Sequence, residues 1–192
     1  MYVKPLIFNI SRASLHDGPG VRSVVYFKGC NMRCAWCHNP EGLERNKQIP
    51  FHRSKCIGCG ICASLCKHIK VSGEINRSDC IRCGKCAENC PVGAISLVGE
   101  EMSIDEVFEV IVKDKEYYVQ SGGGVTISGG ECLLYPEFSA ELLKRCKAEN
   151  IHTLIESAFC IPWENIEMVL PFTDLFFVDI KCMNNEIGRA HV

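Results

Sequence analysis

The chain has 192 residues, of which 47% are hydrophobic, and a formal net charge of −2 at neutral pH. A chain of this length and apolar content can form one sizeable core and a small satellite domain. The small net charge excludes a broad basic surface of the kind that binds nucleic acid. The apolar runs are too short to cross a bilayer, and no basic and apolar leader opens the chain, so we expect a cytoplasmic protein without membrane or nucleic-acid partners.

The 15 cysteines mostly fall into tight runs with two residues between neighbours. In a short secreted protein this content would indicate a disulfide scaffold. Cysteines so close in sequence favour a shared metal centre instead, and a reducing compartment keeps them as ligands. We assign no ligand role to the four cysteines outside the runs, which are Cys132, Cys146, Cys160 and Cys182.

The first predicted elements lead the chain into a cysteine loop. Leu6–Ile10 is apolar and predicts a short strand or an extended arm. Asp17–Gly20 has strong turn chemistry, and Val21–Phe27 is rich in β-branched and aromatic residues, which predicts a buried strand.

Three cysteines follow that strand with the spacing C-x-x-x-C-x-x-C, namely Cys30, Cys34 and Cys37. A structural iron–sulfur cluster normally takes four cysteines, and an open metal position is typical of a catalytic site. We therefore predict a 4Fe–4S cluster whose fourth iron binds substrate. A zinc site completed by His38, or three core thiols, are the alternatives that the spacing alone leaves open.

The segment Lys55–Pro91 contains an internal repeat of four cysteines with two, two and three residues between them. This is the run of bacterial two-cluster ferredoxins, in which the fourth cysteine of each run ligates the other cluster. The predicted ligands are Cys56, Cys59, Cys62 and Cys90 for one 4Fe–4S cluster, and Cys80, Cys83, Cys86 and Cys66 for the other. A zinc ribbon would need paired units with a longer spacer between them, and it fits poorly.

Helices and strands alternate from Met102 onward. Ser103–Glu106 forms a capping box, and the apolar stripe behind it predicts a helix that runs to about Val119. The further predicted helices are Pro136–Asn150 and Pro162–Leu170, and the predicted strands are Val125–Ser128, His152–Glu156 and Leu175–Ile180. This alternation predicts a parallel α/β sheet, and the continuous apolar runs fit strands that are covered on both faces.

Four motifs lie at the ends of predicted strands: the cysteine loop, the turn Ser128–Glu131, the side chain of Glu156 and the segment Asp179–Lys181. Barrels of alternating strands and helices place their ligands at the carboxyl ends of the strands. We therefore expect these motifs to form one active site.

The segment Asp17–Glu41 resembles the radical S-adenosylmethionine (SAM) enzymes, whose motif is C-x-x-x-C-x-aromatic-C, with Trp36 as the aromatic residue here. More specifically it resembles the activating enzymes of glycyl radical enzymes. VTISGGE, residues 125–131, is similar to the GGE segment of that family, although Cys132 stands where the family commonly has proline. The resemblance implies a partial (β/α) radical SAM barrel of about four of six units, with an inserted bacterial-ferredoxin-like two-cluster domain.

The resemblance also implies the chemistry. The open iron would chelate SAM, and reductive cleavage would give a 5′-deoxyadenosyl radical that removes hydrogen from a glycine of a partner glycyl radical enzyme. It implies three 4Fe–4S clusters, SAM, a monovalent cation, and reduced ferredoxin or flavodoxin as the electron donor. Cys30, Cys34 and Cys37 are the expected catalytic residues, and the expected cofactor-binding residues are Trp36, His38, Gly129, Gly130, Glu131, Glu156, Asp179 and Lys181.

We predict a barrel formed by residues 1–50 and 99–186, with the insert at residues 51–98. Residues 187–192 match the in-frame translation of a common sequencing adapter, and we interpret them as read-through. Because the family has six barrel units and a later histidine near the adenosine, we expect a truncated chain that is inactive by itself. A radical SAM enzyme acting on a small molecule and a two-cluster electron carrier are the alternative functions, and the sequence does not identify the partner enzyme.

Overall fold

The computed structural model describes residues 3–70, 72–181 and 183, so Cys182 and residues 187–192 lie outside the described part. The chain divides into two compact units. The first, residues 1–46 with 100–192, is called the sheet unit here, and the second, residues 47–99, is called the cysteine-repeat unit. No helix among the described residues combines the length and the apolar character that crossing a membrane requires.

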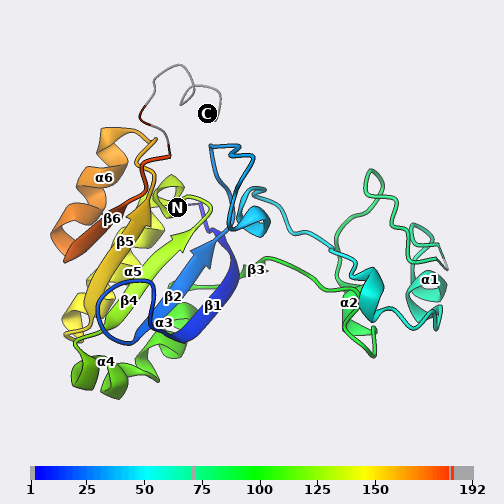
Figure 1. Cartoon of the computed structure of the whole chain (residues 1–192), viewed down its shortest axis with the longest axis horizontal. Helices are drawn as coiled ribbons and strands as arrows, with labels where there is room; N and C mark the ends of the chain where they lie inside the picture. The colour runs from blue at the N-terminus through cyan, green and yellow to red at the C-terminus, as the bar shows by residue number, and fades with distance from the viewer. Residues whose placement is uncertain (1–2, 71, 182, 184–192) are drawn as a thin grey trace. The chain divides into compact units, whose positions relative to one another are not determined.

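The sheet unit is built on a six-stranded sheet with the strand order β3-β1-β2-β4-β5-β6 (Figure 1). The parallel strands are β2 (Arg22–Phe27), β4 (Gly124–Gly129), β5 (His152–Ser157) and β6 (Leu175–Val178). The sheet continues on the other side of β2 with two antiparallel strands, β1 (Leu6–Ser14) and β3 (Glu100–Glu101). The mixed α/β sheet with parallel strands that the alternation predicted is therefore confirmed.

Four helices pack against one face of this sheet: α3 (Ile104–Val112), α4 (Lys115–Ser121), α5 (Pro136–Ala148) and α6 (Trp163–Val169). All four contribute to one hydrophobic core with the strands, and in Figure 1 the long helix α5 lies behind β4 and β5. From the strands this core takes alternate side chains, such as Val25 and Phe27 of β2, because neighbouring residues of a strand point to opposite faces. Short 3₁₀ turns lie at Pro40–Gly42, Arg53–Lys55, Cys132–Leu134 and Leu170–Phe172.

The single helix that was predicted from Ile104 to about Val119 is wrong, because the chain forms α3 and α4 with a break between them. Its start is as predicted: the Glu106 N–H donates to the Ser103 hydroxyl at 3.2 Å, and the Glu106 carboxylate accepts from the Ser103 N–H at 2.7 Å. At the break, Asp114 is buried and accepts hydrogen bonds from Arg12 Nε at 2.7 Å and from the Ser23 hydroxyl at 3.1 Å. The local periodicity contains no sign of these distant partners.

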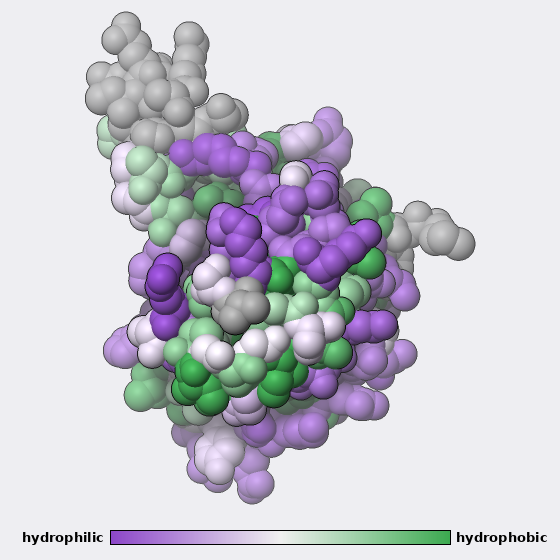
Figure 2. All heavy atoms as spheres, turned by 90° about the vertical axis from the view of Figure 1, so that its right-hand side faces the viewer, coloured by the Kyte–Doolittle hydropathy of each residue, from purple (hydrophilic) through white to green (hydrophobic). Residues whose placement is uncertain are grey.

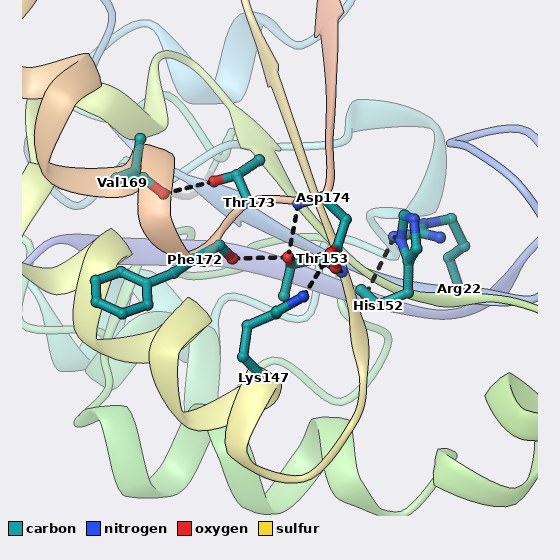
Figure 3. Close-up of polar contacts among 8 residues, drawn as sticks. All are labelled: Arg22, Lys147, His152, Thr153, Val169, Phe172, Thr173 and Asp174. Carbon is teal, nitrogen blue, oxygen red and sulfur yellow. Dashed lines mark hydrogen bonds and ion pairs between the residues drawn. The ribbon is translucent and has the colours of Figure 1, made fainter.

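Hydrogen bonds among polar side chains and backbone groups connect the amino-terminal ends of the parallel strands (Figure 3). The Thr153 N–H donates to Asp174 at 2.9 Å, which ties the start of β5 to the residue that precedes β6. Arg22 is fully buried and donates to Thr126 Oγ1 at 2.7 Å, and a nitrogen of its guanidinium lies 3.3 Å from His152 Nδ1. Burial lowers the pKa of Arg22 to about 10. This end of the sheet is therefore filled by structural contacts.

The last strand, β6, is shorter than predicted and is partly exposed. It ends at Val178 rather than at Ile180, and Phe177 and Val178 are 39% and 56% exposed. Among the described residues β6 pairs with β5 and forms an edge of the sheet. Burial on both faces therefore holds for the inner strands β2, β4 and β5, whereas β6 is only partly buried in the described chain.

The cysteine-repeat unit contains two short helices, α1 (Ile61–Leu65) and α2 (Lys85–Glu88), around a small core of Ile49, Ile69, Cys86 and Ile95. Its internal repeat is visible in the backbone, because each helix begins after a glycine with positive φ, Gly60 at 75° and Gly84 at 83°. Figure 2 shows hydrophobic residues that gather between hydrophilic ones on one face. The exposed large hydrophobic side chains of the cysteine-repeat unit include Ile57, Ile61, Leu65 and Ile81.

Candidate functional site

The cysteine loop begins where β2 ends. Cys30, Cys34 and Cys37 are all half-buried free cysteines. The loop turns tightly, since the Cys37 N–H donates to the Cys34 carbonyl at 3.1 Å and the Met32 N–H donates to Cys30 Sγ at 3.4 Å. Burial raises the pKa of the Cys30 thiol, the hydrogen bond from Met32 partly opposes that shift, and the neighbouring thiols Cys37 and Cys34 add to it. The three thiols therefore lie close to one another on one tightly turned loop.

One cavity of about 350 Å³ opens at the carboxyl ends of the parallel strands, at the opposite end of the sheet from the Arg22 contacts. It is lined by residues that follow β2, β4, β5 and β6. Ten of the predicted site residues line it together: Cys30, Cys34, Cys37, Trp36, His38, Gly129, Gly130, Glu156, Asp179 and Lys181. Motifs as far apart in sequence as residues 30 and 181 thus meet in one place, and their individual roles stay predictions.

The eleventh predicted residue of this group, Glu131, does not line the cavity. Its side chain is buried behind the wall, where it accepts hydrogen bonds from the Ser157 hydroxyl at 2.9 Å and from the Leu133 N–H at 3.1 Å. Burial raises the pKa of Glu131, and these donors partly offset the shift because they favour the carboxylate. These hydrogen bonds join the turn after β4 to the end of β5. The structure therefore shows Glu131 as a contact between these two segments.

The glycine pair of the same turn makes room for neighbouring backbone. Gly129 has a φ of +119°, and a Cβ atom on it would lie 2.2 Å from the Phe27 nitrogen. A Cβ atom on Gly130 would lie 2.3 Å from the Gly29 carbonyl oxygen. Only glycine allows the turn to approach β2 and the cysteine loop so closely, and this contact brings the turn to the cavity wall.

Two hydroxyl groups on the cavity wall, Ser128 and Ser157, were given no individual role in the prediction, although Ser128 begins the predicted turn Ser128–Glu131. The Ser128 hydroxyl donates to a Glu156 carboxylate oxygen at 2.7 Å. Both serines adjoin predicted residues in sequence, Ser128 before the glycine pair and Ser157 after Glu156, and that adjacency is the signal that could have found them. Other cavity residues that the sequence did not single out are Met32, Asn39, Leu43 and Ala158, and Ile180 lies inside the predicted segment Asp179–Lys181.

Asp179 and Lys181 form an ion pair at the end of β6. Burial disfavours the charged form of Lys181, but its hydrogen bond and ion pair with Asp179 outweigh burial and raise its pKa. Lys181 therefore remains a cation on the cavity wall. A site with a cation, two carboxylates and exposed glycine backbone suits a zwitterionic ligand.

The donor set fits an iron–sulfur cluster, because three thiols converge on a cavity and thiolates are the ligands of such clusters. No three His, Cys, Asp or Glu side chains in the described ranges are grouped as one metal ion would need. A four-iron cluster is a larger body than a single ion, and its ligands stand correspondingly apart.

The cysteine-repeat unit contains a cavity of its own. It is lined by one complete set of the predicted cluster ligands, Cys56, Cys59, Cys62 and Cys90. Cys90 Sγ accepts the Ala94 N–H at 3.2 Å, and hydrogen bonds from Ile95 and the neighbouring backbone lower the pKa of its thiol. For the second predicted set, burial raises the pKa of Cys86, and the nearby thiols Cys66 and Cys80 add to the shift.

A family model described as "4Fe-4S single cluster domain" matches residues 16–186. The chain is 44% identical to the (2S)-3-sulfopropanediol dehydratase activating enzyme of Klebsiella oxytoca, over 97% of this chain and 62% of that protein. It is 41% identical to the indoleacetate decarboxylase activating enzyme of Tractidigestivibacter scatoligenes, over 95% and 62%. It is 42% identical to the choline trimethylamine-lyase activating enzyme of Oleidesulfovibrio alaskensis, over 93% and 60%. The chain thus spans about three fifths of the length of these relatives.

Proposed function

Because the chain belongs to the 4Fe-4S single cluster domain family and is similar over nearly its whole length to activating enzymes of glycyl radical enzymes, we propose that it is a radical SAM activating enzyme. Its proposed reaction is the reductive cleavage of SAM, followed by removal of a hydrogen atom from a glycine of a partner enzyme. The observation that supports this most is the single cavity in which three cysteines meet the ends of β4, β5 and β6.

In this proposal Cys30, Cys34 and Cys37 hold a 4Fe–4S cluster. When bound, the cluster supplies the electron that cleaves SAM to methionine and a 5′-deoxyadenosyl radical. The wall residues Met32 and Leu43 limit the access of water to the cavity, because they cover part of it with apolar surface.

The charged wall residues position the methionine end of SAM. Lys181 offers its ammonium group to the SAM carboxylate, and the backbone of Gly129 and Gly130 approaches the SAM amino group. Glu156 and Asp179 supply two carboxylates at neighbouring strand ends, which is a fitting donor set for a monovalent cation. Trp36 and His38 line the same cavity beside the cysteines.

We further propose that the cysteine-repeat unit, predicted as residues 51–98, is a ferredoxin-like domain with two 4Fe–4S clusters. The cavity lined by Cys56, Cys59, Cys62 and Cys90 supports the first ligand set. The packing of Cys66 and Cys80 against the small core that contains Cys86 supports the second. Reduced ferredoxin or flavodoxin would be the electron donor, and a reducing, cytoplasmic compartment would keep these cysteines as thiolates.

The relatives act with three different partner enzymes by their names, a dehydratase, a decarboxylase and a lyase, so similarity does not select the partner. The test is anaerobic reconstitution of the full-length protein with iron and sulfide, then incubation with SAM and dithionite, alone and with the glycyl radical enzyme encoded nearest its gene. We expect 5′-deoxyadenosine and a glycyl radical signal in electron paramagnetic resonance (EPR). SAM cleavage without a glycyl radical would favour a small-molecule substrate, and a protein with intact clusters and no SAM cleavage would overturn the proposal.

A further inference from the structure

Lys28 is fully buried, at the point where β2 passes into the cysteine loop. A buried charged group is costly to the fold unless it is paired or hydrogen bonded. The contacts of the Lys28 ammonium group therefore show which part of the structure this buried charge supports.

The ammonium group of Lys28 donates a hydrogen bond to the backbone carbonyl of Glu41, 13 residues further along the chain. Two backbone hydrogen bonds run alongside it. The Gly29 N–H donates to the Gly42 carbonyl at 2.7 Å, and the Cys30 N–H donates to the Leu43 carbonyl at 3.1 Å. These three bonds join residues 28–30 to residues 41–43 and so close the loop that contains all three cysteines.

The closed base of the loop is packed against the turn after β4. The buried Tyr135 hydroxyl donates to the Lys28 carbonyl at 2.8 Å, which fixes the backbone from which the lysine side chain extends. A Cβ atom on Gly42 would lie 2.7 Å from the Gly130 nitrogen, so the far end of the loop also abuts that turn. An opening of the loop base would therefore disturb the cavity wall as well as the spacing of the cysteines.

We propose that Lys28 is a positioning residue that holds the cysteine loop closed, so that the three thiols of the loop face the cavity together. The importance of the closed loop for catalysis rests on the proposed function. The ammonium group acts as an internal tie between the two ends of the loop. A role in the sheet core alone would not need its charge, because an apolar side chain of suitable volume can fill a core position.

Hydrogen–deuterium exchange of the cluster-free protein tests this tie without any dependence on activity. We compare Lys28→Met, which keeps the apolar stem, with Lys28→Arg, which keeps a charged donor. In Lys28→Met the amides of Gly29 and Cys30 should exchange about tenfold faster, as expected when a hydrogen bond to a charged group is lost. The amides of β4 should be unchanged, and Lys28→Arg should retain most of the protection of the loop. The exposed Lys144, replaced by methionine, is the matched control.

A second readout uses the reconstituted protein. SAM should alter the EPR spectrum of the wild type and of Lys28→Arg, and should alter that of Lys28→Met far less. Unchanged loop exchange in Lys28→Met would overturn the proposal, as would equally fast exchange in Lys28→Arg. Global unfolding of both Lys28→Met and Lys28→Gln would overturn it too, because the lysine would then support the core rather than the loop. If SAM does not alter the EPR spectrum of the wild type, that result contradicts the proposed function. The hydrogen–deuterium exchange experiment would still test the role of Lys28 in closing the loop.

Discussion

The Ser128 hydroxyl donates a 2.7 Å hydrogen bond to the Glu156 carboxylate, which joins the ends of two neighbouring parallel strands on the wall of the cavity. Glu156 lies beside Asp179 at the next strand end, so the bond holds one of the two carboxylates that we propose for the cation and SAM site. A single hydroxyl group thus sets the direction of a charged cavity residue.

Ser128→Ala should weaken SAM binding about fivefold, which corresponds to about 1 kcal/mol, because Glu156 loses a hydrogen-bond donor and its carboxylate is no longer fixed. Glu156→Ala should weaken it further. Isothermal titration of the anaerobically reconstituted protein with SAM measures both. Ser139→Ala removes another buried hydroxyl, one that donates to the Cys132 carbonyl at 3.0 Å, and serves as the control. Equal losses of affinity in the Ser128 and Ser139 variants would contradict a specific role for Ser128.

Simultaneous replacement of Cys30, Cys34 and Cys37 by alanine should lower the iron content from about twelve to about eight atoms per chain, since three four-iron clusters are proposed. The variant should not cleave SAM, because its cavity no longer offers thiolates. Iron analysis and a 5′-deoxyadenosine assay measure the two effects. Cys160→Ala, which changes a half-buried cysteine that is not a predicted ligand, should behave as the wild type. Continued SAM cleavage by the triple variant would defeat the central assignment.

Cys56→Ala or Cys80→Ala should damage the cysteine-repeat unit and leave the cluster of the sheet unit assembled, because the two cavities belong to separate compact units. Dithionite can reduce the remaining cluster directly, so SAM cleavage should survive at least in part. EPR spectra with and without SAM provide the measurement. Loss of the SAM-dependent spectral change in either variant would show that the division of ligands between the units is wrong.

Asp114→Asn should lower the free energy of unfolding at neutral pH by about 1.5–3 kcal/mol, because the hydrogen bonds at this buried carboxylate are charge-assisted. The hydrogen bond from Arg12 holds the pKa of Asp114 below its ordinary value; burial opposes this, and Ser23 supports it. A carboxylate with a lowered folded-state pKa stabilises the protein above its unfolded pKa, and this contribution is lost as the pH falls through the folded pKa. The difference between wild type and variant should therefore shrink below about pH 4.

Urea unfolding at a series of pH values, followed by circular dichroism, measures this difference. Asp105→Asn alters an exposed carboxylate on the same helix pair and should have little effect at any pH. A difference for Asp114→Asn that stays constant down to about pH 3 would show that the charge of Asp114 does not contribute.

The sequence by itself determined the local features of this protein. The capping box at Ser103, the alternation of strands and helices, and the arrival of separate motifs at strand ends all follow from short-range patterns, and the structure shows each of them. The spacing of Cys30, Cys34 and Cys37 likewise predicts that three thiols share one loop. Such features are readable because the groups that cause them lie within a few residues of one another.

Only the tertiary structure decided where the polar groups of distant segments meet. Asp114 lies at the break between α3 and α4, where the local pattern would continue one helix, and Arg12 and Ser23 hold its carboxylate there. Glu131 turns away from the cavity because Ser157 supplies a hydrogen bond that offsets the cost of burying its charge. Lys28, which the pattern does not distinguish from a surface lysine, is buried because the returning loop brings a carbonyl to it. Each of these outcomes depends on a partner far along the chain, so it exists only once the chain has folded.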